Sequence, residues 1–296
     1  MAERRDPGAG VLTADVLRGW PLPSGDGDKD TKGRLLVVGG SESTPGAVLL
    51  AAEAALRAGA GKVQVATTAA TAAHLATALP ECLVVGLPSV SGDISRAAAS
   101  RVVDLALGVD AVLLGPGFID PDSACTLLED VVPHLDLSVV VDALGTAYLT
   151  AHQDGMRHLA SRGLLTPNAS ELAELTGLGE DTVARDLLAA TRTAVRATGL
   201  TVLSGSDTSY VVEPTGGVWR CPAGPPGAAV AGSGDVKAGI VAGLVARGAQ
   251  PAQAAVWGAF VHTRVAEMLV ASVGHVGFLA REMPQLVPRA LAEVGP

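Results

Sequence analysis

Short apolar runs recur along the chain, and each one ends in a loop of glycine or polar residues. These runs occupy residues 34–38, 62–66, 82–86, 111–114, 138–141, 163–165 and 201–204. A run that is apolar at nearly every position is typical of a β-strand covered on both faces, as in a parallel sheet. Because helical stretches separate the runs, the sequence predicts an α/β fold with a mainly parallel sheet and helices on both sides.

The predicted helices lie between these runs, where alanine and larger apolar residues recur at helical spacing. They span residues 46–57, 69–78, 95–107, 122–132, 170–176, 184–198, 236–246, 251–272 and 283–293. A hairpin over residues 202–212, followed by a strand at residue 218, predicts an antiparallel edge of the sheet. Residues 33–296 are predicted to form a single domain, and residues 1–32 an N-terminal tail with a short helix after Thr13.

Composition narrows the classes of function. The chain has 296 residues, of which 48% are hydrophobic and 17% charged, as expected of a globular protein. Aromatic residues make up only 3% and the net charge is −9, so no nucleic-acid partner is expected. No uninterrupted apolar stretch of about 18 residues occurs, so no membrane span is expected.

Cysteine usage and the start of the chain predict where the protein resides. Cys82, Cys125 and Cys221 lie far apart and in no metal-binding or redox spacing. The first residues are polar and contain no apolar signal region. We therefore expect reduced thiols, no metal-ligand cluster and a cytoplasmic location.

Four of the apolar runs end in loops whose residues can do chemistry. These loops are Gly115-Pro116-Gly117, Asp142, Thr166-Pro167-Asn168 and Ser204-Gly205. The carboxyl ends of parallel strands meet at one edge of a sheet, where open α/β sheets bind ligands. We therefore expect a cleft at this edge.

A glycine turn before the helix at residues 236–246 predicts an anion hole. Gly232, Ser233 and Gly234 let the backbone turn and aim free N–H groups at one point, which the helix dipole reinforces. Asp235 follows at the start of the helix, either as the base that takes a proton from an attacking hydroxyl or as a helix cap. Helix-start amides are expected to keep its carboxylate ionised. An anion hole beside a carboxylate indicates nucleotide-dependent phosphoryl chemistry. The sequence contains no Walker lysine motif, so this would be a different kind of phosphate site.

The pattern Gly-Ser-Gly-Asp-Val-x-Ala-Gly at residues 232–239 resembles the anion-hole signature of the ribokinase-like kinases. Further segments narrow the resemblance to the NAD(P)H-hydrate dehydratases, the carbohydrate-kinase-like branch that repairs hydrated nicotinamide cofactors. The matching segments are residues 33–41, 45–61, 114–117, 141–144, 165–168 with Glu171, and Gly205 with Thr208. This ordered set implies a ribokinase-like three-layer α/β/α fold and a single catalytic domain over residues 33–296.

The resemblance also implies the reaction. Such an enzyme uses ADP or ATP to phosphorylate the ring hydroxyl of (6S)-hydrated NADH or NADPH and then eliminates phosphate, which restores NADH or NADPH. Mg²⁺ would balance the phosphate charge through oxygen ligands. Matching positions assign the hydrated cofactor to Ala47, Gly117, Asn168 and Asp235. They assign the adenine nucleotide to Ser204, Gly205, Ser206, Asp207, Thr208 and Gly234.

Several positions depart from the family pattern. Ser204 stands where a lysine is usual, Asn168 where a histidine is usual, and Lys237 where a leucine is usual. The family pattern His-Gly-x-Ala-Gly-Asp, late in the chain, is His-Thr-Arg-Val-Ala-Glu at residues 262–267, so both of its glycines are replaced. Lys237 is interpreted as a solvated helix residue, and His262 as a packed one.

Two other functions stay open. One is a small-molecule kinase of the same fold that acts on a vitamin-precursor alcohol. The other is a non-catalytic nucleotide-binding relative, which the departures at Ser204, Lys237 and residues 263–267 would explain.

Two expectations concern partners. The epimerase domain that accompanies this family is absent, so a separate NAD(P)H-hydrate epimerase is expected in the same pathway. The helix at residues 251–272 is apolar over most of its circumference, so it is either deep core or shared with a neighbour. Together with the resemblance, this favours a homo-oligomer, either a tetramer or a dimer.

Overall fold

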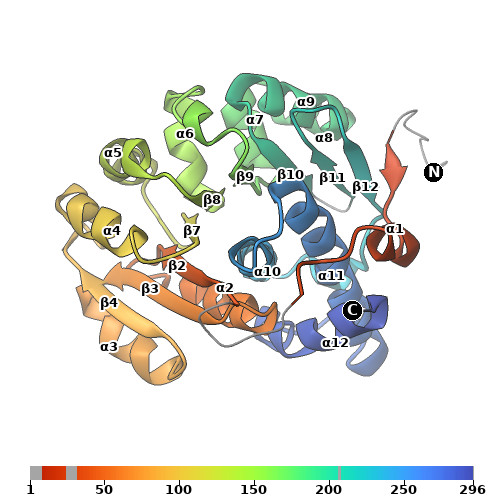
Figure 1. The fold of residues 1–296 in the computed structure, drawn as a ribbon, viewed down its shortest axis with the longest axis horizontal. Helices are drawn as coiled ribbons and strands as arrows, with labels where there is room; N and C mark the ends of the chain where they lie inside the picture. The colour runs from red at the N-terminus through yellow and green to blue at the C-terminus, as the bar shows by residue number, and fades with distance from the viewer. Residues whose placement is uncertain (1–8, 25–31, 206–207, 296) are drawn as a thin grey trace.

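One large sheet runs through the molecule. The computed structural model describes residues 9–24, 32–205 and 208–295, and its main sheet has ten strands in the order β1-β12-β11-β10-β9-β8-β7-β2-β3-β4 (Figure 1). Neighbouring strands from β4 to β10 are parallel, whereas β11 pairs antiparallel with both β10 and β12. The predicted parallel sheet and its antiparallel edge are therefore confirmed.

The strands follow the apolar runs closely. Their bounds in the main sheet are β1 Gly10–Val11, β2 Arg34–Val38, β3 Lys62–Thr68, β4 Leu83–Leu87, β7 Ala111–Leu114, β8 Ser138–Val141, β9 Gly163–Leu165, β10 Thr201–Gly205, β11 Ser209–Val212 and β12 Val218–Cys221. A separate small hairpin consists of β5 Ser89–Val90 and β6 Asp93–Ile94. Neither this hairpin nor β1 was predicted, because two-residue strands are too short to show a hydrophobic period.

Helices connect the strands. Their bounds are α1 Ala14–Arg18, α2 Pro45–Arg57, α3 Ala69–Ala78, α4 Ala99–Ala106, α5 Pro121–Val131, α6 Ala147–Ala151, α7 Ala169–Thr176, α8 Glu180–Arg185, α9 Leu187–Thr198, α10 Ser233–Ala246, α11 Pro251–Ser272 and α12 Val287–Val294. The single helix predicted over residues 184–198 is wrong at its start. Asp186 leaves the helical conformation there, and its side chain caps α9 by accepting a hydrogen bond from the backbone N–H of Ala189.

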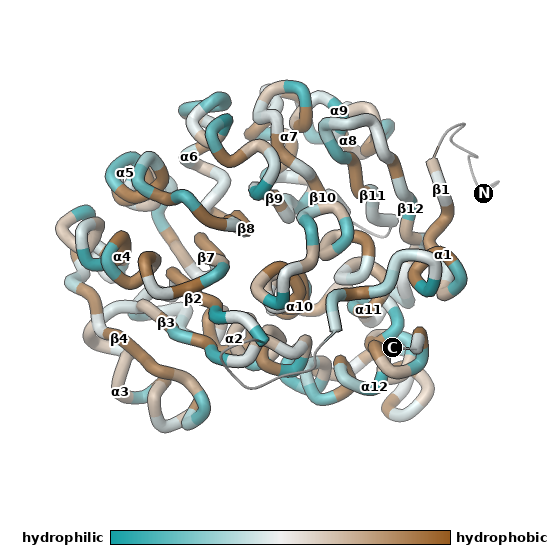
Figure 2. Tube along the Cα trace, in the orientation of Figure 1, coloured by the Kyte–Doolittle hydropathy of each residue, from teal (hydrophilic) through white to brown (hydrophobic). Residues whose placement is uncertain are grey.

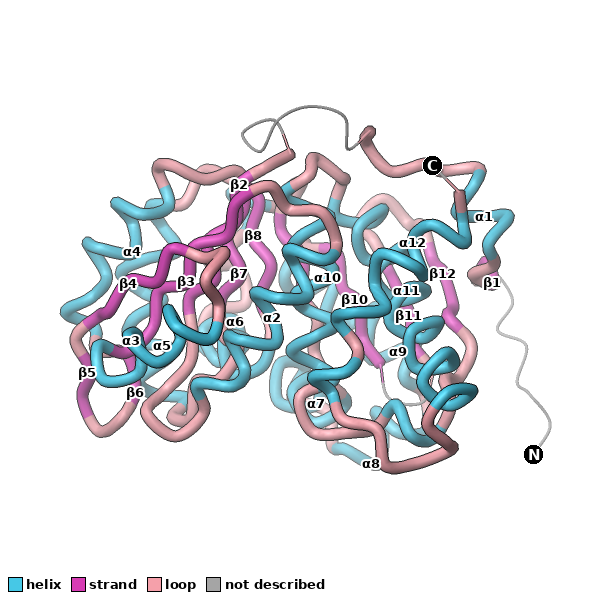
Figure 3. The backbone as a smooth tube through the Cα atoms, turned by 90° about the horizontal axis from the view of Figure 1, so that it is seen from below, coloured by secondary structure: helices cyan, strands magenta, loops and turns pink. Residues whose placement is uncertain are grey.

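Alternate residues of the strands pack into two separate hydrophobic cores, one on each face of the sheet. Leu35 and Val37 of β2 pack with α2, α10 and α11, whereas Leu36 and Val38 pack with α4, α5 and α9. The central strands are accordingly hydrophobic along their length (Figure 2), and their apolar side chains are buried. Helices cover both faces of the sheet (Figure 3), which confirms the predicted three-layer α/β/α architecture.

The segment before β2 packs onto the domain. The predicted short helix is present as α1, and Leu17 within it is fully buried. The Trp257 indole N–H donates a hydrogen bond to the Trp20 carbonyl at 2.9 Å, and the Gln253 amide donates one to the Pro21 carbonyl at 2.8 Å. Residues 9–24 therefore belong to the folded structure.

Helix α11 is a core helix. Val256, Trp257, Val261 and Val265 are all almost fully buried within one chain. Its apolar circumference is thus accounted for without a neighbouring copy, and homo-oligomerisation stays a prediction. In the described part of the chain, no helix combines the length and the hydropathy that crossing a bilayer requires.

Candidate active site

The first turn of α10 lies at the carboxyl edge of the sheet and organises the site. Gly232 is the N-cap of this helix and adopts a left-handed conformation, with φ of 89°. The helix therefore begins at Ser233, three residues earlier than predicted, and Asp235 is its third residue. Among the described residues, no side chain caps the first turn, so the interpretation of Asp235 as the cap is wrong. The N–H groups of the first turn remain available to a ligand.

Helices α2 and α10 pack side by side through small residues. Gly239 lies against the carbonyl of Ala51, and a Cβ on Gly243 would stand 2.6 Å from the carbonyl oxygen of Ala55. Both contacts advance by four residues, so the helices run parallel in a fixed register. From the same register we infer that Ala47 lies beside Asp235, one turn earlier.

The Gly117 loop closes around the start of α2. The Thr44 hydroxyl donates a 2.6 Å hydrogen bond to the carbonyl of Gly117. A Cβ on Gly117 would stand 2.9 Å from the Cβ of Ala47, and Gly117 has φ of 75°. Ala47 and Gly117 therefore touch, on the side of α10 that carries Asp235.

A cavity of about 390 Å³ opens on another side of the same turn. It is lined by Asn168, Gly205, Ser209, Gly224, Pro225, Pro226, Ala228, Ala229, Ser233, Gly234, Lys237, His262 and Thr263. The structure thus brings together Asn168, Gly205 and Gly234 from the predicted site. Lys237 lines this cavity, so its interpretation as a solvated helix residue is wrong.

Three carboxyl groups lie close to the first turn of α10, and burial raises the pKa of all three. Burial raises the pKa of Asp142 to about 7, although Asp142 accepts a 2.6 Å hydrogen bond from the Thr166 hydroxyl. Burial, and then the charge of Asp142, raises the pKa of Glu171 to about 7.

Asp235 shares this environment. Burial, and then the charge of Glu171, raises the pKa of Asp235 to about 6. The sequence had led us to expect that helix-start amides would dominate. Loss of hydration outweighs them, although a group with this pKa is still mostly ionised at pH 7.

Burial lowers the pKa of both basic side chains of the cavity. Burial lowers the pKa of Lys237, while the charges of Asp142 and Glu171 oppose that effect. Burial, and then Lys237, lowers the pKa of His262 to about 4. The neutral imidazole lies with Nε2 at 3.0 Å from the Ser233 carbonyl oxygen, so it donates to the first residue of α10. His262 is thus a packed helix residue, as predicted, that also lines the cavity.

The other residues predicted for the site have different positions relative to the cavity. Asn168 caps α7 in a reciprocal capping box with Glu171, whose carboxylate accepts from the Asn168 side-chain amide at 2.7 Å. The Ser204 hydroxyl is fully buried and lies 2.5 Å from the Thr191 hydroxyl, so only its backbone is available to a ligand. Thr208 does not line the cavity. Ser206 and Asp207 lie outside the described residues.

The sequence placed Asp142 at the ligand edge of the sheet, at the end of a buried strand, but it predicted no role in the site for Asp142, Glu171, Lys237 or His262. Lys237 carried a usable signal, because it shares a helix face with Ser233, four residues earlier.

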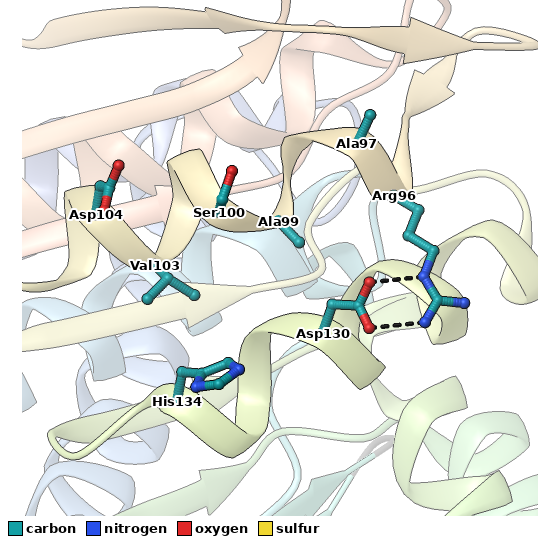
Figure 4. Close-up of a pocket in the computed structure, with 8 residues that line it drawn as sticks. All are labelled: Arg96, Ala97, Ala99, Ser100, Val103, Asp104, Asp130 and His134. Carbon is teal, nitrogen blue, oxygen red and sulfur yellow. Dashed lines mark hydrogen bonds and ion pairs between the residues drawn. The ribbon is translucent and has the colours of Figure 1, made fainter.

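Two further polar clusters lie elsewhere. A cavity of about 480 Å³ is lined by α4 and the turn before it, and by Asp130 and His134 (Figure 4). In it the Arg96 guanidinium pairs with both Asp130 oxygens at 2.6 and 2.7 Å. Cys125, Glu129 and His152 bring potential ligand atoms within 4.8 Å of one another, although their sequence spacing gave no hint of it. His152 Nε2 already lies 3.0 Å from the Glu129 carboxylate. Of the residues predicted for the site, those that the structure describes belong to neither cluster.

Comparison with known proteins identifies the family. A family model described as NAD(P)H-hydrate dehydratase matches residues 35–289. An ADP-dependent (S)-NAD(P)H-hydrate dehydratase from Xanthomonas campestris is 40% identical over 291 residues, which cover 96% of this chain and 97% of that protein. A bifunctional NAD(P)H-hydrate repair enzyme from Moorella thermoacetica is 32% identical, and the match covers 95% of this chain but 53% of that protein.

Solved structures share the fold. A ribokinase-like superfamily protein from Enterococcus faecalis superposes with a TM-score of 0.83 at 23% identity, covering 99% of each chain. An ADP/ATP-dependent NAD(P)H-hydrate dehydratase from Bacillus subtilis, co-crystallized with ATP and Mg²⁺, gives a TM-score of 0.79 at 22% identity, covering 98% of this chain and 100% of that one. The predicted ribokinase-like fold is confirmed, and with the sequence matches it shows that this chain belongs to the NAD(P)H-hydrate dehydratase family.

Proposed function

We propose that this protein uses ADP or ATP to convert hydrated NADH and NADPH back to NADH and NADPH. The helix register supports the proposal, because from it we infer that Asp235 lies between two compartments. On one side lie Ala47 and Gly117, and on the other lies the cavity that contains Gly205 and Gly234. A base placed there can reach a hydroxyl from one side while a phosphoryl group arrives from the other.

In the first step, Asp235 accepts the proton of the ring hydroxyl. The hydroxyl oxygen bonds to the terminal phosphorus of the nucleotide, and the bond from that phosphorus to the leaving nucleotide breaks. A pKa of about 6 suits Asp235 to this task, because the group is ionised at neutral pH yet basic enough to take a proton. The N–H groups at the start of α10 stabilise the negative charge on the transferred phosphoryl group.

In the second step, phosphate leaves the ring. A hydroxyl is a poor leaving group, and phosphorylation turns it into a good one. The lone pair of the ring nitrogen expels the phosphate, and loss of a neighbouring ring proton restores the dihydropyridine. The protein therefore contributes chiefly by holding the ring and excluding water.

The residues present fit Mg²⁺ as the counter-ion of the nucleotide. Asp142 and Glu171 offer the oxygen ligands that this ion prefers, and the charge of Asp142 raises the pKa of Glu171. A divalent cation held by these two carboxylates, directly or through water, would favour their ionised forms. When bound, Mg²⁺ would neutralise charge on the phosphate oxygens.

The test is a product assay on the purified protein with hydrated NADH, Mg²⁺, and either ADP or ATP. We expect the absorbance of reduced nicotinamide to return and one phosphate to be released per NADH formed. A stable phosphorylated product without recovered NADH would instead indicate a small-molecule kinase. Nucleotide binding without turnover of the hydrate would indicate a non-catalytic relative.

The choice of donor and the partners belong to the same proposal. The name of the Xanthomonas relative supports ADP, and that of the Bacillus protein supports either nucleotide. A separate epimerase that interconverts the hydrate epimers would supply the S form, and a homo-oligomer in the cytoplasm is the expected state. Initial rates with each donor, and the mass in solution by light scattering, test these points.

A further inference from the structure

Lys237 lies on the second turn of α10 and faces the cavity beside the first turn. Helical side chains lean toward the helix N-terminus, and residues four apart share a face, so the Lys237 side chain extends over Ser233. Asp235 is two residues away, on the opposite side of the helix. The lysine therefore belongs to the compartment that contains Gly205 and Gly234.

Lys237 is the only lysine, arginine, aspartate or glutamate among the described residues that line this cavity. His262 stays neutral at physiological pH and donates its proton to the Ser233 carbonyl. Strand β10 brings no charge, because the Ser204 hydroxyl is turned into the core against Thr191. The cavity also contains the positive end of the α10 dipole at Ser233 and Gly234. An anion is the ligand that this combination attracts.

The Lys237 ammonium has no fixed partner among the described residues. Asp142 and Glu171 act on it through space, and neither forms an ion pair or a hydrogen bond with it. A partly buried ammonium gains free energy when a charged acceptor completes its hydrogen bonds.

We propose that Lys237 binds the terminal phosphate groups of the adenine nucleotide and donates hydrogen bonds to the phosphoryl group during its transfer. The inference rests on the proposed function and deepens it, because it names the residue that supplies the cation. In the transfer step, the bond between the terminal phosphorus and the leaving nucleotide breaks, and its electron pair moves onto the leaving oxygen. The Lys237 ammonium stabilises the negative charge that this movement spreads over the phosphates.

The experiment compares Lys237→Met and Lys237→Arg with the wild type in calorimetric titrations with adenosine, AMP, ADP and ATP in the presence of Mg²⁺. Methionine keeps the length of the apolar stem but removes the charge. We expect K237M to weaken ADP and ATP binding on the order of 10- to 100-fold, the usual worth of a hydrogen bond to a charged group. Adenosine affinity should be unchanged, and K237R should recover most of the ADP affinity.

Lys62→Met is the matched control, because it removes the same charge at the start of β3. It should leave all four affinities unchanged. The inference is wrong if K237M binds ADP as the wild type does, or if adenosine binding falls as much as ADP binding, which would indicate a structural role. If the wild type binds no adenine nucleotide at all, the proposed function fails together with the inference. If the wild type binds and turns over and K237M matches it, only the inference fails.

Discussion

Gly239 of α10 lies directly against the backbone carbonyl of Ala51 in α2, with no room for a Cβ between them. This contact sets the distance between the two helices. It also sets their register, which brings Ala47 of α2 beside Asp235 of α10. The geometry of the site therefore depends on a glycine one helical turn away from the base.

Gly239→Ala should destabilise the protein. The added methyl group would meet a backbone carbonyl, which cannot rotate away, and overpacking of this kind costs about 1–3 kcal/mol. Alanine recovers about 1 kcal/mol of helix propensity, so a net loss of up to about 2 kcal/mol is expected. Gly46→Ala in α2 is the control, because a Cβ there meets nothing within 4 Å. Urea unfolding of both variants measures the difference, and equal midpoints would refute the packing argument.

Asp235→Asn should separate catalysis from folding. Asparagine keeps the size of the side chain but cannot accept the proton, so turnover should fall by a factor on the order of 10² to 10⁴. Nucleotide affinity should hold or improve, because a negative charge close to the phosphates is removed. Asp122→Asn is the control, since Asp122 is also an acidic residue in the first turn of a helix, α5. A wild-type rate for D235N in a folded, nucleotide-binding protein would show that Asp235 is not the base.

The stability of the ligand-free protein should depend on Asp142 and on pH. Its pKa rises from 3.8 in the unfolded chain to about 7 in the folded one, so folding favours the protonated form. The resulting stabilisation is fully present below pH 3.8 and is lost as the pH rises through about 7.

Asp142→Asn should remove this dependence, because the amide oxygen can still accept from Thr166 and carries no charge. Between pH 5 and pH 8, the wild type should lose stability relative to D142N. Melting temperatures of both proteins across this range, without nucleotide, provide the measurement. Parallel pH curves for the two proteins would contradict the raised pKa.

The segment before β2 should contribute to stability. Leu17→Ala removes a fully buried side chain, which costs about 2–5 kcal/mol in a core that cannot collapse around the gap. Val16→Ala in the same helix is the control, because Val16 is 37% exposed and such changes usually stay within about 0.5 kcal/mol. If chemical unfolding shows the two variants to be equally stable, residues 9–24 are not part of the cooperative unit.

The sequence alone determined the sheet and predicted the place of the site. Continuous apolar runs predict strands buried on both faces, because only a sheet covered by helices hides every side chain of a strand. The glycine turn at Gly232 predicts an anion hole at the start of α10, because only such a turn aims several backbone N–H groups at one point. Both features depend on residues adjacent in the chain, so local chemistry suffices to find them.

Only the tertiary structure decided the charge state and the partners of the site residues. The pKa of Asp235 is raised rather than lowered, because burial and Glu171 outweigh the helix-start amides. Lys237 faces the cavity because β10, α7 and the start of α10 converge around it. Ser204 turns its hydroxyl into the core because Thr191 of α9 lies behind it. Burial and electrostatic coupling are sums over residues far apart in sequence, so no local pattern could supply them.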